Sequence, residues 1–371
     1  MHPHKLTRVL LVFSSSELGG AERSLTRMAV AADGEVEFAL ATLDGPGPWV
    51  DWCREQGRQP FVIGKRRRAS RHGRFGVLAI VRLAALVRRQ RYAALYVIGL
   101  RASIWLRLMR PWLSNVRIVQ GVRWNPDSNS RLDRAFRLVE WGFGRFIDCY
   151  ICNSKAAAAT LAQKIGISEK KIRVIYNGLN DVPPIPARMN HPPTHVVVLA
   201  NISERKGHFQ FLDVVSNVLR HMPDVRFFFV GRDDMKGRLI LEIERRGLAS
   251  AITLTGYQPD VGRWLQDASV MVLPSLWGEG CPTSILEGQA YGLPVIAYAI
   301  DGVPELILDG IDGLLAVPGN TIALTSALLR VLAEPTLAAR MGGAGRAKVA
   351  REFTLARCAS LHSDVFLEVA S

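Results

Sequence analysis

Short apolar segments alternate with amphipathic helical segments along almost the whole chain, and this alternation limits the possible folds more than any other feature. Turn residues bound each apolar segment, and a helical pattern separates it from the next. Such an order predicts parallel sheets covered by helices on both faces, an α/β fold. The predicted strands cover residues 8–13, 38–43, 94–99, 116–122, 148–153, 195–200, 225–231, 251–256, 270–274 and 294–298, and a further strand that ends in a turn lies within 171–180.

A proline-rich segment divides this pattern into two halves of similar size. Residues 182–193 hold five prolines and no periodic pattern, which is typical of a linker. We therefore predict two Rossmann-like domains, residues 1–181 and 194–350, facing each other across a cleft. A helix over 351–371 is expected to return to the N-terminal domain. Because open α/β sheets bind ligands at the carboxyl ends of their strands, the cleft is the expected site.

Positive charge is concentrated in the first half of the chain. The net charge is +14, and residues 1–181 hold 30 Lys and Arg against 14 Asp and Glu. No acidic residue occurs between Glu55 and Asp127. This excess favours an anionic partner, which could be nucleic acid, an anionic membrane or a phosphorylated substrate.

Several protein classes are not favoured. No run approaches the ~18–20 apolar residues of a membrane span, and the N-terminus does not resemble a secretion signal. Five cysteines in a chain of this length indicate a reducing compartment, so we expect a cytoplasmic protein. Cys149 and Cys152 have a spacing that redox and zinc sites use, but they lie in a strand pattern and would point to opposite faces.

The segment LWGEGCPTSILEGQAYGLPVIA, residues 276–297, places chemistry on the loop and helix that follow a strand. Pro282 and Thr283 mark a helix N-terminus, where free N–H groups and the helix dipole favour an anion. Glu287 lies about one turn into that helix, and a carboxylate there can accept hydrogen bonds from the hydroxyls of a ribose. Glu279 on the loop could hold a second sugar. The layout fits a nucleotide sugar, although a solvated loop glutamate and a glutamate near a helix start would produce the same pattern.

Two further loops after strands could hold a diphosphate. Lys206 and Gly207 precede a helix, as do Gly19 and Gly20. A lysine can neutralise phosphate, and glycine lets the backbone approach it. Either pair alone is also common in ordinary turns. The chain contains no P-loop, no G-x-S-x-G and no D-x-D triplet, so a metal–diphosphate site of the common kind is not supported.

Taken together and in this order, these loops resemble the retaining glycosyltransferases of family 4, which have the GT-B fold. The resemblance extends over nearly the whole chain. It is carried by ELGGAERSL, NSKAAAATLAQKIGISEKKIRVIYNGLN, SERKGHFQF, EGCPTSILE and GLPVIAYAIDGVPELILDGIDGLL.

The resemblance implies a role for each loop. Lys206 would bind the donor diphosphate, Glu287 the nucleotide ribose and Glu279 the transferred sugar. Gly20 would contact the donor from the N-terminal domain. No metal or other cofactor would be required, and a leaving phosphate oxygen would take the acceptor proton. The expected donor-binding residues are Gly19, Gly20, Asn201, Arg205, Lys206, Gly280, Cys281, Pro282, Thr283, Ser284 and Glu287.

The chain departs from the family pattern at two positions. Asn201 stands where an arginine is frequent, and Arg205 could compensate. Arg123 stands where a histidine is frequent. An arginine cannot act as a base near neutral pH, but it could stabilise charge on the donor or hold an anionic acceptor. The expected catalytic residues are Glu279, Lys206 and Arg123.

The acceptor and its location are predicted from the basic half of the chain. Residues 75–91 and 102–113 combine apolar side chains, Trp105, Trp112 and arginines, which suits a surface near anionic lipids. They could equally be ordinary helices that cover a sheet. We expect transfer from a nucleotide sugar, with UDP favoured, to a lipid-linked, polysaccharide or lipopolysaccharide acceptor. The enzyme would lie peripherally on the inner face of a bacterial membrane.

Three other interpretations remain open at this point. A GT-B nucleotide-sugar epimerase would need acid and base residues that the sequence does not obviously provide. A basic protein without catalytic activity could bind nucleic acid or a membrane, but this would leave the loops unexplained. An inactive scaffold is conceivable because of Asn201 and Arg123, and turnover would separate it from an enzyme.

Overall fold

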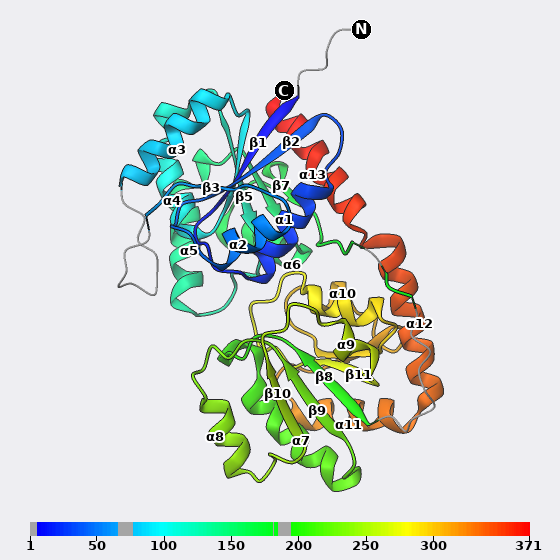
Figure 1. The fold of residues 1–371 in the computed structure, drawn as a ribbon. Coiled ribbons are helices and arrows are strands. Elements are labelled where there is room, and N and C mark those ends of the chain that lie inside the picture. The colour runs from blue at the N-terminus through cyan, green and yellow to red at the C-terminus, as the bar shows by residue number, and fades with distance from the viewer. Residues whose placement is uncertain (1–5, 66–76, 181, 185–193) are drawn as a thin grey trace. The chain divides into compact units, whose positions relative to one another are not determined.

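The chain forms two compact units (Figure 1). The computed structural model describes residues 6–65, 77–180, 182–184 and 194–371. Residues 1–180 and 355–371 form unit 1, and residues 181–354 form unit 2. The predicted linker, 182–193, lies mostly outside the described residues.

Unit 1 is built on a seven-stranded, fully parallel sheet with the order β3-β2-β1-β4-β5-β6-β7. Most of its strands are buried on both faces, which is why they read as continuous apolar runs in the sequence. The strands are β1 Thr7–Phe13, β2 Val36–Thr42, β3 Phe61–Val62, β4 Ala94–Ile98, β5 Arg117–Val122, β6 Cys149–Cys152 and β7 Ile172–Val174.

Helices cover both faces of this sheet. Leu10 and Val12 of β1 lie in one core with α3 to α6, whereas Val9, Leu11 and Phe13 lie in a second core with α1, α2 and α13. This alternation follows from the two-residue period of a strand. The helices are α1 Gly20–Ala31, α2 Pro48–Glu55, α3 Val77–Gln90, α4 Leu100–Leu108, α5 Arg131–Phe143, α6 Lys155–Ala159 and α13 Leu355–Ala370.

The C-terminal helix α13 belongs to unit 1, although unit 2 precedes it in the sequence. It begins where the Leu355 N–H donates to the Leu179 carbonyl, 2.7 Å away. Phe366 is fully buried against Phe38 and Tyr96. The return of this helix starts at 355 rather than at the predicted 351, because α12 continues to Glu352 as part of unit 2.

Cys149 and Cys152 lie in different cores. Cys149 packs with the α13 side of the sheet and Cys152 with the opposite side, as the period of the strand requires. Burial raises the pKa of Cys149 to about 11 and that of Cys152 to about 12, so both thiols are protonated at neutral pH. They do not form a joint site.

Unit 2 repeats the architecture with a six-stranded parallel sheet in the order β10-β9-β8-β11-β12-β13. Both units therefore show the strand order 3-2-1-4-5-6 of a Rossmann fold, and the predicted α/β class is confirmed. The strands are β8 His195–Leu199, β9 Arg226–Val230, β10 Ile252–Gly256, β11 Val270–Leu273, β12 Val295–Tyr298 and β13 Gly313–Ala316. The helices are α7 His208–His221, α8 Arg238–Arg245, α9 Gly262–Gln266, α10 Thr283–Ala290, α11 Thr321–Ala333 and α12 Pro335–Glu352.

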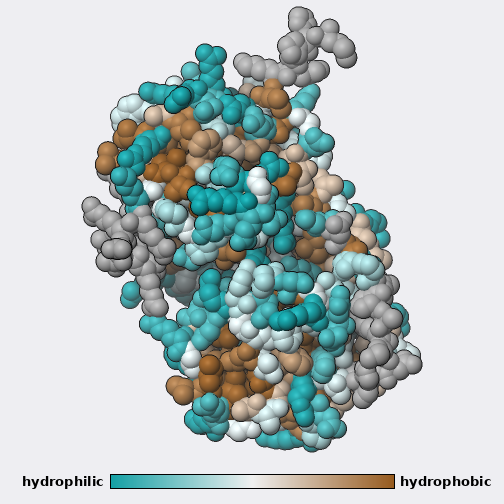
Figure 2. Space-filling model, viewed as in Figure 1, coloured by the Kyte–Doolittle hydropathy of each residue, from teal (hydrophilic) through white to brown (hydrophobic). Residues whose placement is uncertain are grey.

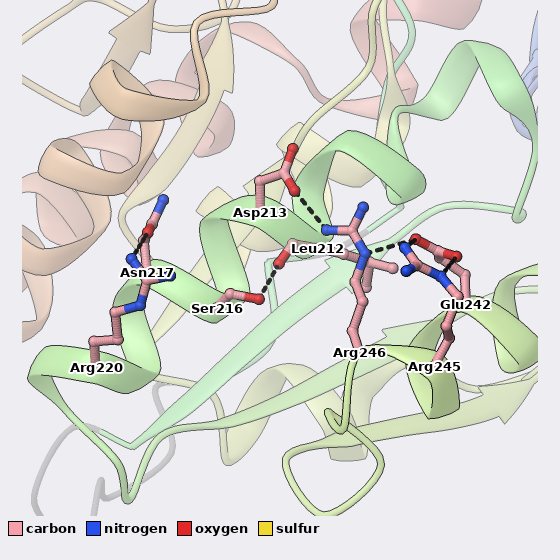
Figure 3. Close-up of polar contacts among 8 residues, drawn as sticks. All are labelled: Leu212, Asp213, Ser216, Asn217, Arg220, Glu242, Arg245 and Arg246. Carbon is pink, nitrogen blue, oxygen red and sulfur yellow. Dashed lines mark hydrogen bonds and ion pairs between the residues drawn. The ribbon is translucent and has the colours of Figure 1, made fainter.

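A cluster of ion pairs joins α7 to the end of α8 (Figure 3). Arg246 donates to Asp213 of α7 and, at 2.7 Å, to Glu242 of α8. Arg245 also donates to Glu242. These hydrogen bonds from Arg245 and Arg246 lower the pKa of Glu242 to about 2. The carboxylate therefore stays charged over the physiological range and holds α8 beside α7.

Among the described residues, no single helix is long and apolar enough to cross a membrane. The helices α11 and α12 meet the criteria of length and composition only as a pair, and a bend of 102° separates them.

Candidate functional site

The strand order of unit 2 brings two of the sequence-predicted loops to one edge of its sheet. The strand β8 pairs with β9 on one side and β11 on the other, and the connections leave the sheet in opposite directions at this point. Rossmann-like sheets bind their ligands at such a switch point, beyond the carboxyl ends of the strands. Residues 200–207 follow β8 and residues 274–282 follow β11. The Lys206 loop and the Glu279 loop are therefore neighbours, although more than 70 residues separate them.

Lys206 and Glu279 form an ion pair at this edge. The Lys206 Nζ atom donates to Glu279 Oε1, and the two side chains are only 13% and 5% exposed. Burial lowers the pKa of Lys206, and Glu279 opposes this shift. Burial also raises the pKa of Glu279, but the charges of Lys206 and Arg205 outweigh it and the net pKa is lowered. Each group thus favours the charged form of the other.

Arg205 ties the same two loops together. Its Nη1 atom donates to the Gly278 carbonyl at 3.2 Å and lies 3.7 Å from Glu279 Oε1. Its own carbonyl accepts from the Leu276 N–H at 2.8 Å. The Arg205 side chain is 45% exposed, so part of the guanidinium remains available to a ligand. Its position beside Lys206 is compatible with the predicted compensation for the arginine that position 201 lacks.

Gly207 is required for this close approach. It has φ +69°, and a Cβ atom there would lie 2.0 Å from the Pro274 carbonyl oxygen. Only glycine satisfies both the left-handed backbone and the contact. The residue that ends the Lys206 turn therefore also sets the spacing of the two loops.

The helix α10 presents its N-terminus next to Glu279. Pro282 is its N-cap, and no side chain caps the N–H groups of the first turn. Those N–H groups and the helix dipole favour an anion. Cys281 and Ser284 are buried, so they contribute backbone rather than side-chain surface. Glu287 is half-buried in the following turn of the same helix, where its charge contributes to the raised pKa of Tyr291, after burial and Asp260.

Asp301 holds the backbone of Glu279 and was not predicted from the sequence. Its Oδ2 atom accepts from the Glu279 N–H at 3.0 Å, and the Glu279 carbonyl accepts from the Gly302 N–H at 3.4 Å. Asp301 itself has φ +47°, which is unusual for a residue with a side chain. The Asp-Gly pair three residues after the end of a predicted strand is the signal that could have indicated this turn.

Asn201 connects two loops of unit 2. Its Oδ1 atom accepts from the Arg232 N–H at 3.1 Å, and the next residue, Ile202, bridges to Asp233. The side chain thus joins the loop after β8 to the loop after β9. Its predicted role in donor binding remains a prediction.

His208 is a second residue that the sequence reasoning missed. It is fully buried at the start of α7 beside Phe229, and its ring nitrogens have no hydrogen-bond partner among the described residues. Burial and the charge of Lys206 lower its pKa to about 3. The imidazole is therefore neutral at physiological pH and packs as a core side chain behind the Lys206 loop.

In unit 1, Gly19 and Gly20 lie at the N-terminus of α1, as predicted. Gly19 is the N-cap and Gly20 is the first helical residue. The Glu22 carboxylate folds back over this turn, since a Cβ on Gly19 would lie 2.6 Å from Glu22 Oε2. Burial raises the pKa of Glu22 above its usual value, although a hydrogen bond from the Gly19 backbone partly opposes this shift. The molecule's own carboxyl group thus occupies the turn that was expected to hold an anion.

Arg123 follows β5 at the carboxyl edge of the unit 1 sheet, but its guanidinium is engaged inside the unit. Its Nη2 atom donates to Asn177 Oδ1 and lies 3.5 Å from Ser24 Oγ, and its Nε and Nη1 atoms are buried. Ser24 also donates to Asn177 at 2.9 Å. This geometry joins α1 to the segment after β7. It supports a positioning role, and the predicted catalytic role is not tested by it.

The structure thus brings together most of the predicted residues of unit 2. Lys206, Arg205, Glu279 and the start of α10 lie at one edge of its sheet, with Glu287 in the same helix. Within the ranges that the structure describes, no group of three or more His, Cys, Asp and Glu side chains could hold a metal ion. Independence from metal stays a prediction.

Comparison with known proteins identifies the family. The model of the glycosyl transferases group 1 matches residues 186–348, and the model of Glycosyltransferase Family 4 matches residues 18–182. The chain belongs to the group 1 glycosyltransferases of family 4.

The curated relatives match over part of their length. The amylovoran biosynthesis glycosyltransferase AmsK of Erwinia amylovora is 29% identical over 203 residues, which are 51% of this chain and 49% of AmsK. A phosphatidyl-myo-inositol mannosyltransferase of Mycobacterium leprae is 32% identical over 149 residues, 40% of this chain and 39% of that protein. The matched part spans about half or less of these relatives.

Solved structures match the fold over nearly the whole chain. The crystal structure of Anabaena HepE in complex with UDP and glucose superposes with a TM-score of 0.82 at 18% identity, covering 97% of this chain and 99% of HepE. The two Rossmann-like units and these neighbours confirm the predicted GT-B fold.

Proposed function

We propose that this protein is a glycosyltransferase that moves a sugar from a nucleotide-sugar donor, with UDP as the preferred carrier, to a glycan or lipid-linked acceptor. The observation that carries the proposal is the buried Lys206–Glu279 pair beside the uncapped N-terminus of α10. A diphosphate would be attracted to Lys206, Arg205 and the free N–H groups of α10. Binding would release Glu279 from Lys206, so that Glu279 could accept hydrogen bonds from the transferred sugar. Glu287 would hold the ribose.

Retention of anomeric configuration and independence from metal belong to the same proposal. The positive groups at the edge of the unit 2 sheet can neutralise the leaving diphosphate without a metal ion. A leaving phosphate oxygen would then take the proton of the attacking acceptor hydroxyl. Arg123 would act by positioning Ser24 and Asn177 in unit 1 rather than by touching the reacting atoms.

The relatives support the classes of donor and acceptor. HepE was crystallised with UDP, with UDP and glucose, and with UDP-glucose. The curated relatives include proteins named for the biosynthesis of amylovoran, the Vi polysaccharide and colanic acid, and a phosphatidyl-myo-inositol mannosyltransferase. We therefore favour a surface polysaccharide or a lipid-linked precursor as acceptor, with the enzyme in the cytoplasm on the inner face of the membrane.

The first test is ligand-induced thermal stabilisation by UDP, GDP, ADP and CMP, measured in the presence of EDTA. A ligand at ~100 times its dissociation constant should stabilise the protein by about 2.7 kcal/mol. We expect UDP to raise the melting temperature, and the Lys206→Ala and Glu287→Ala variants to lose this increase. Because Lys206→Ala also leaves Glu279 without its main counter-ion, the quantity compared is the shift caused by ligand, not the starting temperature.

Lys236→Ala and Glu244→Ala are the matched controls, since both residues are exposed on unit 2 and neither belongs to the Lys206 loop, the Glu279 loop or α10. They should keep the full response to UDP. A response that needs added metal would contradict metal independence. If no nucleotide stabilises the wild-type protein, the donor site is wrong. Product anomers determined by NMR with a UDP-sugar that binds would decide between retention and inversion.

A further inference from the structure

The outer helical layer of unit 1 exposes an unusual number of large apolar side chains. This layer comprises α3, α4, α5 and the short 3-10 helices Arg110–Leu113 and Gly144–Phe146. Of the twenty large apolar residues exposed among the described part of the chain, eight lie within residues 77–146. They are Leu78, Val81, Leu108, Trp112, Leu132, Leu138, Trp141 and Phe143. We call the outer surface of this layer the α3–α5 face.

Most of the charged residues of this segment are basic. Residues 77–146 contain thirteen arginines and three acidic residues. Asp133 is buried and accepts from Trp124 at 2.9 Å, Glu140 is buried with Arg107, and Asp127 is paired with Lys164. Glu140 and Asp127 are thus each paired with a cation, and Asp133 is hydrogen-bonded inside the unit, whereas exposed arginines remain beside the exposed apolar groups.

The helix α5 separates its two faces clearly. Asp133, Phe136 and Glu140 are buried, at a spacing of three and four residues that marks the inner stripe. The opposite stripe, with the same spacing, contains Arg131, Arg134, Leu138, Trp141 and, just beyond the helix, Arg145; all five are exposed. The side chain of Trp141 is 77% exposed, the largest value among the exposed apolar residues of the described chain.

The neighbouring helices continue this surface. Arg88 of α3 donates to the Trp112 carbonyl at 2.9 Å, which places Trp112 beside the end of α3. The buried Arg107–Glu140 pair joins α4 to α5, with Nη2 of Arg107 at 2.6 Å from both carboxylate oxygens. Figure 2 shows hydrophobic residues interspersed with hydrophilic ones over the region where Figure 1 draws α3. The exposed groups therefore belong to one continuous layer.

We propose that the α3–α5 face binds the surface of an anionic lipid bilayer, with Trp112 and Trp141 at the level of the headgroups. Arginines would pair with lipid phosphates, while the tryptophan, leucine and valine side chains leave water for the acyl boundary. The inference specifies how the enzyme of the proposed function reaches its membrane, but it rests on the α3–α5 face alone and not on the donor site.

The same observations disfavour two other occupants. A second copy of the chain bound through this face would place arginines against arginines, and the one exposed acidic residue of the segment, Asp127, is already paired with Lys164. Nucleic acid would satisfy the arginines, but it would leave exposed aliphatic side chains such as Leu78, Val81 and Leu138 without an apolar partner. A lipid surface satisfies both kinds of group at once.

Flotation of the full chain with vesicles tests the proposal. Vesicles of phosphatidylcholine alone would be compared with vesicles containing equal parts of phosphatidylcholine and phosphatidylglycerol. We expect binding only to the anionic vesicles, and weaker binding in high salt. The variant Arg131→Gln/Arg134→Gln/Arg145→Gln should lower the affinity by about 100-fold, since each arginine near an anionic surface contributes about 1 kcal/mol. Leu138→Ala/Trp141→Ala should lower it by at least tenfold.

Matched changes on unit 2 provide the control. Arg220→Gln/Arg238→Gln/Arg263→Gln removes three exposed arginines, and Leu241→Ala/Ile322→Ala removes two exposed apolar groups. Both controls should bind vesicles like the wild type. If they weaken binding as much as the α5 variants, or if the α5 variants bind normally, the proposal is wrong.

Two further measurements separate the remaining outcomes. Tighter binding to single-stranded DNA or RNA than to anionic vesicles would overturn the proposal in favour of nucleic acid. Concentration-dependent self-association that Leu138→Ala/Trp141→Ala abolishes would assign the face to a second copy. The α5 variants should keep the UDP-induced thermal shift. If the wild-type protein binds vesicles but no nucleotide raises its melting temperature, the proposed function is wrong and the inferred membrane binding still holds.

Discussion

At the scale of single residues, Gly207 fixes the spacing between the Lys206 loop and Pro274 at the proposed donor site. Both its φ of +69° and the 2.0 Å distance from a hypothetical Cβ to the Pro274 carbonyl oxygen oppose any side chain. Gly237 has a similar φ of +80° but open space around it. We expect Gly237→Ala to cost about 1–2 kcal/mol, and Gly207→Ala at least about 2 kcal/mol more, because the Lys206 loop must move away from Pro274.

Chemical denaturation of both variants measures this difference in the free energy of unfolding. Gly207→Ala should also weaken the response to UDP, whereas Gly237→Ala should not. Equal costs for the two variants would show that the contact between the Lys206 loop and the Pro274 loop is loose.

At the scale of elements, a buried polar network joins α4, α5 and β6. Arg107 and Glu140 are 1% and 0% exposed, and the Tyr150 hydroxyl donates to Glu140 at 2.5 Å. Burial and the charge of Glu140 raise the pKa of Tyr150, so its phenol remains a donor. Removing one member of such a pair leaves the other charge buried without compensation.

We therefore expect Glu140→Gln to destabilise unit 1 by about 3–5 kcal/mol. The double variant Arg107→Met/Glu140→Leu should be less harmful, because it removes both charges and keeps apolar volume. Urea unfolding of the two variants gives the comparison. A double variant as unstable as Glu140→Gln would mean that shape, not charge, dominates at this position.

At the scale of the whole molecule, unit 1 is completed by the last helix of the chain. Phe366 of α13 is fully buried in the unit 1 core, as Phe211 is in the core of unit 2. Replacing either phenylalanine by alanine should lower the free energy of unfolding by about 3–5 kcal/mol. We expect Phe366→Ala to speed amide hydrogen exchange in β1, β2 and β4 while leaving β8 and β11 protected. Phe211→Ala should do the reverse, and mass spectrometry of peptides from both units reads this out. Equal loss of protection in both units after Phe366→Ala would mean that they unfold together.

The architecture could be predicted largely from the sequence, because the elements that define it carry local patterns. The predicted strand over 8–13 matches β1 apart from its first residue, and the start of α10 at Thr283 follows the helix N-terminus predicted from Pro282 and Thr283. Segments without a strong period were missed: β3 has two residues, and β13 lies in a glycine-rich turn region. The Lys206 and Glu279 loops were found because strand ends, glycines and charged residues coincide there.

What the sequence by itself determined is the order of strands and helices, the two-unit α/β class and the position of the Lys206 and Glu279 loops after their strands, since each depends on near neighbours along the chain. Only the tertiary structure decided what those residues touch. In the folded unit 2, Lys206 pairs with Glu279 and the Glu279 N–H donates to Asp301. Asn201 accepts a hydrogen bond from the loop after β9. The tertiary structure also commits Arg123 to Asn177 within unit 1. Such contacts join residues from 22 to 73 positions apart, and only the packing of strands into a sheet brings the two residues of each contact together within their own unit.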